Sequence, residues 1–223
     1  EDDEVFACPM AVCSADLDEQ EFTIVFQVRG PKTAFLAGEG DQLAVKGPYR
    51  AGLFGVRRLY GAADQRVLII VSSTGQSLVP AIVRQLTLAD NDIRIVLDPG
   101  SGGGLYILDY LREWEGPVLA ARLYDAQARE ELGPLRELIR DSDCDLIITL
   151  GSDSLHRRAA RWIRPEQGWV ASNNSVMVCA DGVCGSCSIV LRDGREVRGC
   201  KVDIAPEDVF WRAADRPAAE GEG

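Results

Sequence analysis

Four short runs of mainly apolar residues lie in the middle of the chain. They cover Val67–Val71, Ile93–Leu97, Val118–Leu123 and Asp145–Leu150. A continuous apolar run of this length is typical of a strand that is buried on both faces of a parallel sheet. We therefore predict four parallel strands between residues 63 and 172.

Stretches with helical spacing follow these runs. We expect helices over residues 80–88, from the glycines near 104 through Trp114, over 126–139 and over 154–163. Strands that alternate with helices imply a doubly wound parallel sheet with right-handed crossovers. Ligands bind such sheets beyond the carboxyl ends of the strands. The candidate ligand loops are therefore residues 72–77, 98–104 and 151–154.

The first 62 residues have a different pattern. Phe22–Val28 is rich in β-branched and aromatic residues, and Gln42–Lys46 alternates with a period of two. Both patterns are typical of strands, and Gly38 and Gly40 between them favour a turn. We expect an all-β domain here. The whole chain would then be an α+β multidomain protein.

Four cysteines near the C-terminal end carry the candidate chemistry. Cys179, Cys184, Cys187 and Cys200 follow the spacing C-x4-C-x2-C-x12-C. This is the plant-type spacing for a [2Fe–2S] cluster, which four thiolates hold. Small residues fill the loop between the first three, so its backbone N–H groups can approach the sulfurs. The stretch 188–197, with Asp-Gly at its centre, predicts a hairpin that returns Cys200 to the loop.

Other interpretations of the cysteines remain open. Structural zinc usually takes two C-x2-C pairs or Cys and His together, whereas this chain has one such pair and one His, His156. An odd cysteine count in a chain of this size disfavours disulfides. Four unrelated buried cysteines are a third interpretation. Cys8, Cys13 and Cys144 lie outside the motif, and we expect them to be small buried side chains.

Composition limits the function classes. The formal net charge of −11 argues against nucleic acid as a partner, because nucleic acid binding needs a basic surface. No apolar run approaches 18 residues, so we expect no membrane span, and no signal peptide is recognisable. Thiolate ligands suggest a reducing, cytoplasmic setting. We expect a β-barrel domain over 1–62, an α/β domain over 63–172, a cluster module over 173–212 and an acidic tail over 213–223.

This order of segments resembles the ferredoxin–NADP reductase superfamily. More closely, it resembles the electron-transfer subunits of dihydroorotate dehydrogenase and the small subunits of NADH-dependent ferredoxin–NADP oxidoreductase. The cysteine loop, its tail CKVDIAPEDVFW and the stretch Gly47-Pro48-Tyr49 with Gly52 and Phe54 carry the resemblance. It implies a β-barrel, here N-terminally incomplete, that carries FAD, an α/β domain that faces NAD(P), a [2Fe–2S] module and a redox partner subunit.

The resemblance also implies flavin-binding positions. The family segment Arg-Pro-x-Ser falls on residues 8–11, where Pro9 is kept and the arginine and the hydroxyl are absent. Loss of these groups removes expected contacts to flavin and phosphate. The family Gly-x-Gly-Thr falls on residues 30–33. The implied flavin residues are Pro9, Met10, Ala11, Val25, Phe26, Gln27, Lys32, Thr33, Gly47 and Pro48.

The nicotinamide side departs further from the family. Its glycine-rich loop falls on Ser72–Pro80, where Gly75 and Pro80 are kept, and its Cys-Gly-Pro motif falls on Leu150–Asp153 without the cysteine. The resemblance implies an oxidoreductase subunit that passes electrons between NAD(P)H, FAD and a partner through the cluster. The alternative is a non-catalytic relay or assembly subunit that has lost nicotinamide turnover. We assign no catalytic side chain and expect His156 to be a surface or capping residue.

Overall fold

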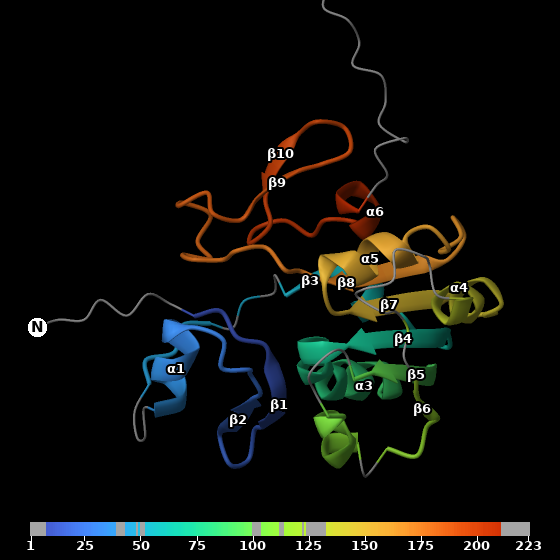
Figure 1. The fold of residues 1–223 in the computed structure, drawn as a ribbon, viewed down its shortest axis with the longest axis horizontal. Helices are drawn as coiled ribbons and strands as arrows, with labels where there is room; N and C mark the ends of the chain where they lie inside the picture. The colour runs from blue at the N-terminus through green and yellow to red at the C-terminus, as the bar shows by residue number, and fades with distance from the viewer. Residues whose placement is uncertain are drawn as a thin grey trace, which may run out of the picture.

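A mixed α/β arrangement is found in this computed structural model. The structure describes residues 8–38, 43–47, 49, 52–99, 104–111, 114–121, 123 and 133–210. Within these ranges a six-stranded sheet is accompanied by two separate two-stranded antiparallel sheets. Figure 1 shows the large sheet in the centre, one hairpin on the N-terminal side and the other above it.

The large sheet has the strand order β3-β8-β7-β4-β5-β6. Its parallel strands are β4 (Arg66–Ser72), β5 (Asp92–Asp98), β6 (Val118–Ala120), β7 (Leu146–Leu150) and β8 (Gly168–Ser172). The chain crosses from β4 to β5 on one side and returns through β7 on the other. The switch point, where ligands bind in such sheets, is therefore the carboxyl end of β4.

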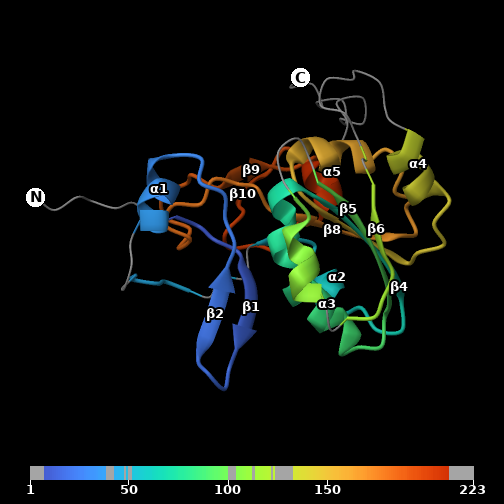
Figure 2. The same ribbon diagram turned by 60° about the horizontal axis from the view of Figure 1, so that its bottom comes forward.

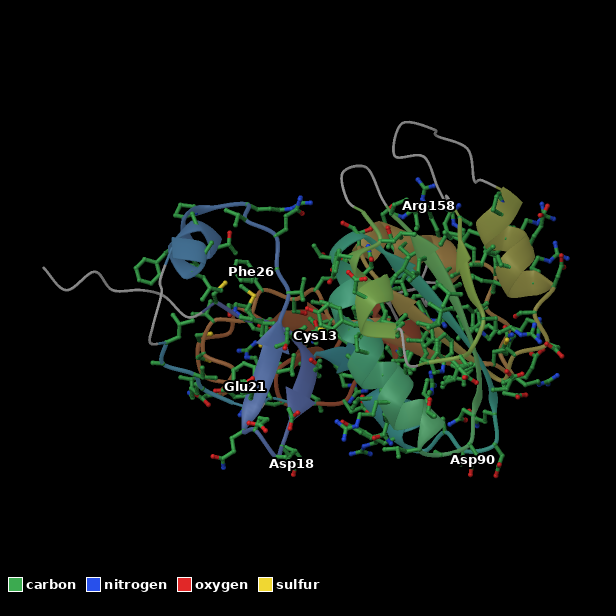
Figure 3. The ribbon with its side chains drawn as sticks, turned by 90° about the horizontal axis from the view of Figure 1, so that it is seen from below. Cys13, Asp18, Glu21, Phe26, Asp90 and Arg158 are labelled. Carbon is green, nitrogen blue, oxygen red and sulfur yellow. The ribbon has the colours of Figure 1, made fainter. Side chains whose placement is uncertain are left out.

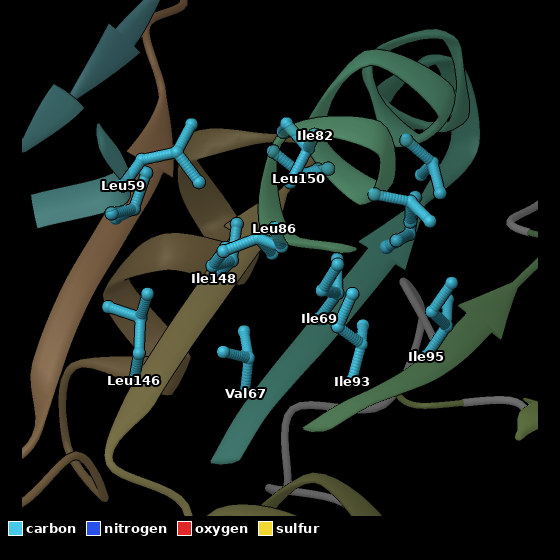
Figure 4. Packing of buried hydrophobic residues seen from close by; sticks show 14 of the residues in the cluster. Leu59, Val67, Ile69, Ile82, Leu86, Ile93, Ile95, Leu146, Ile148 and Leu150 are labelled. Atoms are coloured by element: carbon cyan, nitrogen blue, oxygen red, sulfur yellow. The ribbon is translucent and has the colours of Figure 1, made fainter. Parts of the chain in front are cut away.

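Two apolar layers cover the sheet. One contains α2 (Val56–Tyr60), α3 (Val79–Thr87) and the 3₁₀ turn η2 (Tyr106–Leu111), and the other contains α4 (Gly133–Arg140) and α5 (Asp153–Ala159). Figure 2 shows these helices on opposite sides of the strands. In the close view of Figure 4, Ile69, Ile148 and Leu86 pack between α3 and the sheet. Alternate residues of the same strands, such as Leu68 and Ile70, fill the other layer, so the central strands β4 and β7 are buried on both faces.

The N-terminal segment contains helices as well as strands, so the expectation of an all-β domain is wrong. In its described residues, β1 (Val12–Asp16) pairs with β2 (Glu21–Ile24), and α1 spans Pro31–Gly38. Of the strand expected at Gln42–Lys46, residues 43–46 form no strand, and Gln42 lies outside the described residues. An alternating segment becomes a strand only when a neighbouring strand pairs with it. The expected barrel is therefore represented in the described residues by one hairpin.

The C-terminal segment consists of a loop, a hairpin and a short helix. The hairpin pairs β9 (Ser188–Val190) with β10 (Glu196–Arg198), which confirms the predicted hairpin, and α6 spans Pro206–Val209. Phe210 packs against Phe54 and Trp169, with ring centroids 5.7 Å and 5.8 Å away. These aromatic contacts attach the segment to β3 (Leu53–Phe54) and β8.

Other sequence predictions differ in detail from the structure. β8 and its antiparallel neighbour β3 are additional to the four strands expected. The helix expected through Trp114 is the 3₁₀ turn η2, and α5 ends at Ala159 rather than 163. The expected helix over 126–139 is observed from Gly133, and 126–132 lie outside the described residues. In the part of the chain that the structure describes, no helix has the length and apolarity needed to cross a membrane.

Candidate functional site

The four predicted cluster ligands are gathered at one end of the C-terminal segment as two contacting pairs. The Cys184 side chain acts on the thiol of Cys179, and the Cys187 side chain acts on that of Cys200, so the members of each pair lie close together. Cys187 and Cys200 are buried together, whereas Cys184 is exposed. Residues separated by as many as 21 positions are therefore brought into one small volume.

Backbone N–H groups of the loop point at these sulfurs. The N–H groups of Asp181 and Cys184 donate to Cys179 Sγ over 3.3 Å and 3.5 Å. The amides of Cys184 and Asp181, the Cys184 side chain and the amide of Val183 together lower the pKa of the Cys179 thiol to about 6. A thiol with this pKa is mainly thiolate at neutral pH, which is the form that binds metals.

The loop uses left-handed backbone conformations to bring these N–H groups inward. Gly182 and Gly185 have φ angles of 80° and 77°, and Ala180 has a φ of 52°. Glycine adopts such angles without strain, whereas alanine does so at a cost of the order of 1 kcal/mol. A Cβ on Gly182 would also lie 2.9 Å from Cγ of Lys201. The close wrapping of the loop therefore depends on these small residues.

The β9–β10 hairpin positions the fourth cysteine. Its turn contains Gly194 with a φ of 87°, which a tight turn requires. Just beyond β10, the N–H of Gly199 donates to the carbonyl of Cys187 over 2.9 Å. This hydrogen bond fixes Cys200 next to Cys187.

The four thiols differ in how well they match the ligands of two kinds of metal centre. Among the described residues, no three or more His, Cys, Asp or Glu side chains form a group that could hold a metal ion. Tetrahedral zinc needs four ligands around one point. A [2Fe–2S] cluster differs in that its four thiolates are divided between two irons. The residues therefore fit a [2Fe–2S] cluster in ligand type and number.

The implied flavin residues of β1 and β2 lie beside one another. Val12 is paired with Ile24, so residues 9–11 and 25–27 run side by side beyond the paired part of the hairpin. Met10, Ala11, Val25 and Phe26 are partly buried, and Pro9 and Gln27 are exposed. This surface of apolar side chains suits the flat ring of a flavin.

The remaining implied flavin residues have mixed environments. Thr33 Oγ1 accepts the N–H groups of Arg29 and Gly30 over 2.9 Å and 3.2 Å, so this hydroxyl caps the start of α1. Lys32 and Gly47 are exposed, and Pro48 lies outside the described residues. Arg29, which the sequence analysis did not name, donates to Gln27 over 2.6 Å and places a cation beside the hairpin. The cations Arg29 and Lys32 are of the kind that binds a pyrophosphate group.

The carboxyl end of β4 is filled by the chain itself. The 3₁₀ turn η1 (Ser73–Leu78) follows β4, and its Gly75 is buried so closely that a Cβ would lie 2.4 Å from the Leu150 carbonyl oxygen. Gln76 Nε2 donates to the Gly104 carbonyl over 3.2 Å. Ser72 Oγ and Gln76 Oε1 are buried without a hydrogen-bond partner in the described part of the structure. Of the candidate loop 98–104, residues 100–103 lie outside the described ranges.

His156 is fully buried, so its expected surface position is wrong. Its Nδ1 lies 2.9 Å from Thr149 Oγ1, and its Nε2 lies 3.0 Å from Ser172 Oγ. Trp169 Nε1 donates to the same Thr149 oxygen, and Ser172 Oγ donates to the Gly151 carbonyl. We assign the proton to Nε2, because Ser172 Oγ then receives a donor while Thr149 donates to Nδ1.

This network joins the end of β7 to β8. Burial lowers the pKa of His156 to about 4, so the imidazole is neutral at physiological pH. Phe210 lies over the ring with a centroid distance of 4.9 Å. The histidine therefore connects the Gly151 turn with the aromatic contact that holds the cysteine segment, and its role in the structure is positional.

Comparison with solved structures identifies the fold. The structure of NADH-dependent reduced ferredoxin-NADP oxidoreductase, a protein studied for flavin-based electron bifurcation, matches with a TM-score of 0.69 and 24% sequence identity. The match covers 92% of this chain and 74% of that chain. The chain has a ferredoxin–NADP reductase-like fold.

Other comparisons add nothing to this assignment. A shikimate 5-dehydrogenase from Mycobacterium fortuitum matches with a TM-score of 0.31 and 15% identity over 48% of this chain and 37% of that chain, which is too low to support an argument. No protein-family model and no curated protein matches the chain. The reductase-like fold therefore rests on the three-dimensional match.

On this reductase-like fold, the basic residues of α5 lie on an outer face. Arg157 is exposed and pairs with Asp153 over 3.8 Å, and Arg161 is exposed just beyond the helix. In Figure 3, Arg158 lies on the far side of the sheet from Cys13, which sits between the hairpin and the α/β sheet. Arg157 and Arg161 therefore belong to a solvent-facing surface.

Proposed function

We propose that the chain is the electron-transfer subunit of an oxidoreductase complex. It passes electrons between NAD(P)H, FAD and a partner redox centre through a [2Fe–2S] cluster on Cys179, Cys184, Cys187 and Cys200. One observation carries the proposal: the four thiols meet in two pairs, and loop amides donate to Cys179. Such a subunit needs a partner subunit and a reducing, cytoplasmic setting for its thiolates.

The protein supplies ligands and electrostatics at this site. The cluster would supply one-electron chemistry, and its potential depends on net charge, hydrogen bonds to sulfur and exposure. The amides of Asp181 and Cys184 stabilise negative charge at Cys179. Cys184 is exposed, so an electron acceptor could approach the site from this side.

The structure offers more support for an FAD site than for an NAD(P) site. The adjoining segments 9–11 and 25–27, with Arg29 and Lys32 nearby, support an FAD site in the N-terminal segment. The end of β4 supports a second candidate function, an iron–sulfur relay or assembly subunit without nicotinamide turnover. Buried Gly75 and the bond from Gln76 to Gly104 occupy the place where a dinucleotide would approach the sheet.

Chemical analysis of the purified chain tests the first proposal. We expect two irons and two sulfides per chain, with the broad visible absorption of a cluster and added flavin bands. The variant Cys184→Ser should lose most of the iron and the absorption. Cys8→Ser is the matched control, because Cys8 lies outside the cysteine motif, and this variant should keep the wild-type iron content.

Two results would contradict the cluster assignment. One is a colourless, folded protein after anaerobic reconstitution with iron and sulfide. The other is unchanged iron content in the Cys184→Ser variant. Reduction of an artificial acceptor by NADH or NADPH separates the two candidate functions: turnover by this chain alone excludes the relay without nicotinamide activity.

A further inference from the structure

An ion pair joins the N-terminal segment to the cysteine loop. Lys46 Nζ contacts Asp181 Oδ2, although the two residues are 135 positions apart in the sequence. Figure 1 shows the loop between β8 and β9 above the N-terminal segment, and the ion pair marks a point where the two segments meet.

Asp181 connects this lysine to a cluster ligand. The backbone N–H of Asp181 donates to Cys179 Sγ over 3.3 Å while its carboxylate holds Lys46. Lys201 also acts on the Asp181 carboxylate through its charge, and its stem lies against Gly182. A cation from the N-terminal segment is therefore held at the loop that contains the candidate ligands.

The ion pair itself contributes little to folding. The side chains of Lys46 and Asp181 are 68% and 45% exposed, and exposed pairs contribute roughly 0–1 kcal/mol. Its opposite charges still act on any charge change at the neighbouring sulfurs, because Coulomb energy falls only with the first power of distance.

We propose that Lys46 and Asp181 tune the reduction potential of the cluster in opposite directions and that their contact fastens the cysteine loop to the N-terminal segment. This inference rests on the proposed cluster. Reduction adds one electron and so one negative charge to the cluster, which the Lys46 cation stabilises and the Asp181 carboxylate opposes. Lys46 directly precedes Gly47 and Pro48, so the same segment would contact both redox centres.

The contact can be tested without a cluster. A carbodiimide that joins an amine directly to a carboxylate should cross-link Lys46 to Asp181 in the metal-free full chain, and mass spectrometry should find the joined peptides. The cross-link should be absent in Lys46→Met and in Asp181→Asn. Absence of the cross-link in the folded wild-type chain would overturn the fastening contact, whatever the outcome of the cluster analysis.

The potential can be tested on the reconstituted protein by redox titration monitored by electron paramagnetic resonance. Lys46→Met should disfavour reduction by about threefold, a shift of about 28 mV to lower potential for one electron. Asp181→Asn should shift the potential upward. A purely structural role would give shifts of the same sign or loss of the cluster in both variants, so opposite signs identify the charge effect.

Two controls complete the test. Lys46→Arg keeps the charge and should keep the wild-type potential. Arg195→Met removes an exposed cation of the C-terminal segment, whose partner is Asp193 in the turn of the β9–β10 hairpin. This variant should shift the potential less than Lys46→Met does. Equal potentials in the wild type, Lys46→Met and Asp181→Asn would overturn the inference while leaving the cluster intact. Failure of the wild type to bind a cluster would overturn the proposed function and the tuning with it.

Discussion

The polar groups of the His156 network and those of the cysteine loop differ in their hydrogen-bond partners. Around His156, both ring nitrogens, the Thr149 hydroxyl and the Ser172 hydroxyl have partners within the protein. In the cysteine loop, thiols contact one another, and amides donate to sulfur, which is a weak acceptor unless it is ionised. The polar groups around His156 therefore all have hydrogen-bond partners. In the cysteine loop, the hydrogen bonds from the amides to sulfur become stronger when the sulfur carries negative charge.

This difference separates structural from functional polar groups. Buried polar groups that satisfy one another rigidify a core. A loop whose donors point at thiols is organised for thiolates, and thiolates bind metals. His156, the one histidine of the chain, accordingly has a structural role, whereas the loop amides are placed to stabilise a thiolate at Cys179.

The largest change in stability is expected at the carboxyl end of β4, where the 3₁₀ turn η1 packs against the sheet. Gly75→Ala should lower the free energy of unfolding by about 3 kcal/mol, because the new methyl group would meet the Leu150 backbone at 2.4 Å. Gly52→Ala is the control, since nothing lies within 4 Å of the position that its Cβ would take, and it should change stability little. Denaturant titration measures both, and equal stabilities would show that the turn can open at low cost.

An effect of similar size is expected from pH. The pKa of His156 is about 4 in the folded protein and 6.5 for an ordinary histidine, so the unfolded chain binds this proton first. The contribution of His156 is therefore present above pH 6.5 and is lost as the pH falls towards 4, in total about 3 kcal/mol. Unfolding titrations at several pH values should show this loss in the wild type and less of it in His156→Gln.

Nuclear magnetic resonance gives a direct check on the same residue. The chain has one histidine, so its ring signals need no further assignment. They should stay in the neutral form down to about pH 5, because the pKa of His156 is about 4. A titration midpoint near 6.5 in the folded protein would contradict the buried network.

The smallest effect concerns thiol reactivity in the metal-free protein. Alkylation of Cys179 should reach half its maximal rate at about pH 6, because loop amides lower its pKa to about 6. At pH 7 we expect it to react about fourfold faster than an ordinary thiol, since its lower nucleophilicity offsets much of the gain in thiolate. Cys144, whose pKa burial raises, is the internal control and should react far more slowly. Peptide mass spectrometry measures both rates, and equal pH profiles would argue against stabilisation by the amides.

The sequence predicted the parts of the fold that repeat one simple pattern. β4, β5 and β7 were recognisable because both faces of each are apolar. β8 was missed because Gly168 and Ser172 enclose a run of only three apolar residues. The helix α1 was missed because its residues lie between two segments with strand character, and the strand expected at Leu43–Lys46 has no partner among the described residues.

In the candidate site, too, local sequence signals could be predicted, whereas contacts between distant residues could not. The cysteine spacing is a local signal, so the four candidate ligands could be proposed from the sequence. Lys46 and Asp181 lie 135 residues apart, and only the folded chain brings them together. The network of His156 depends on Thr149 and Ser172 of two different strands, and no local pattern indicates it.

The short antiparallel strand β3 has a consequence for synthesis on the ribosome. Leu53 pairs with Ser172, and beyond β3 the N–H of Gly55 donates to the Ile204 carbonyl over 2.7 Å. These partners emerge more than a hundred residues later, so early translation products cannot close this edge. We expect the parallel strands β4 and β5 to form first and the N-terminal segment to dock only after the cysteine segment has left the exit tunnel. The cysteine loop would then reach its final position in the last step of folding.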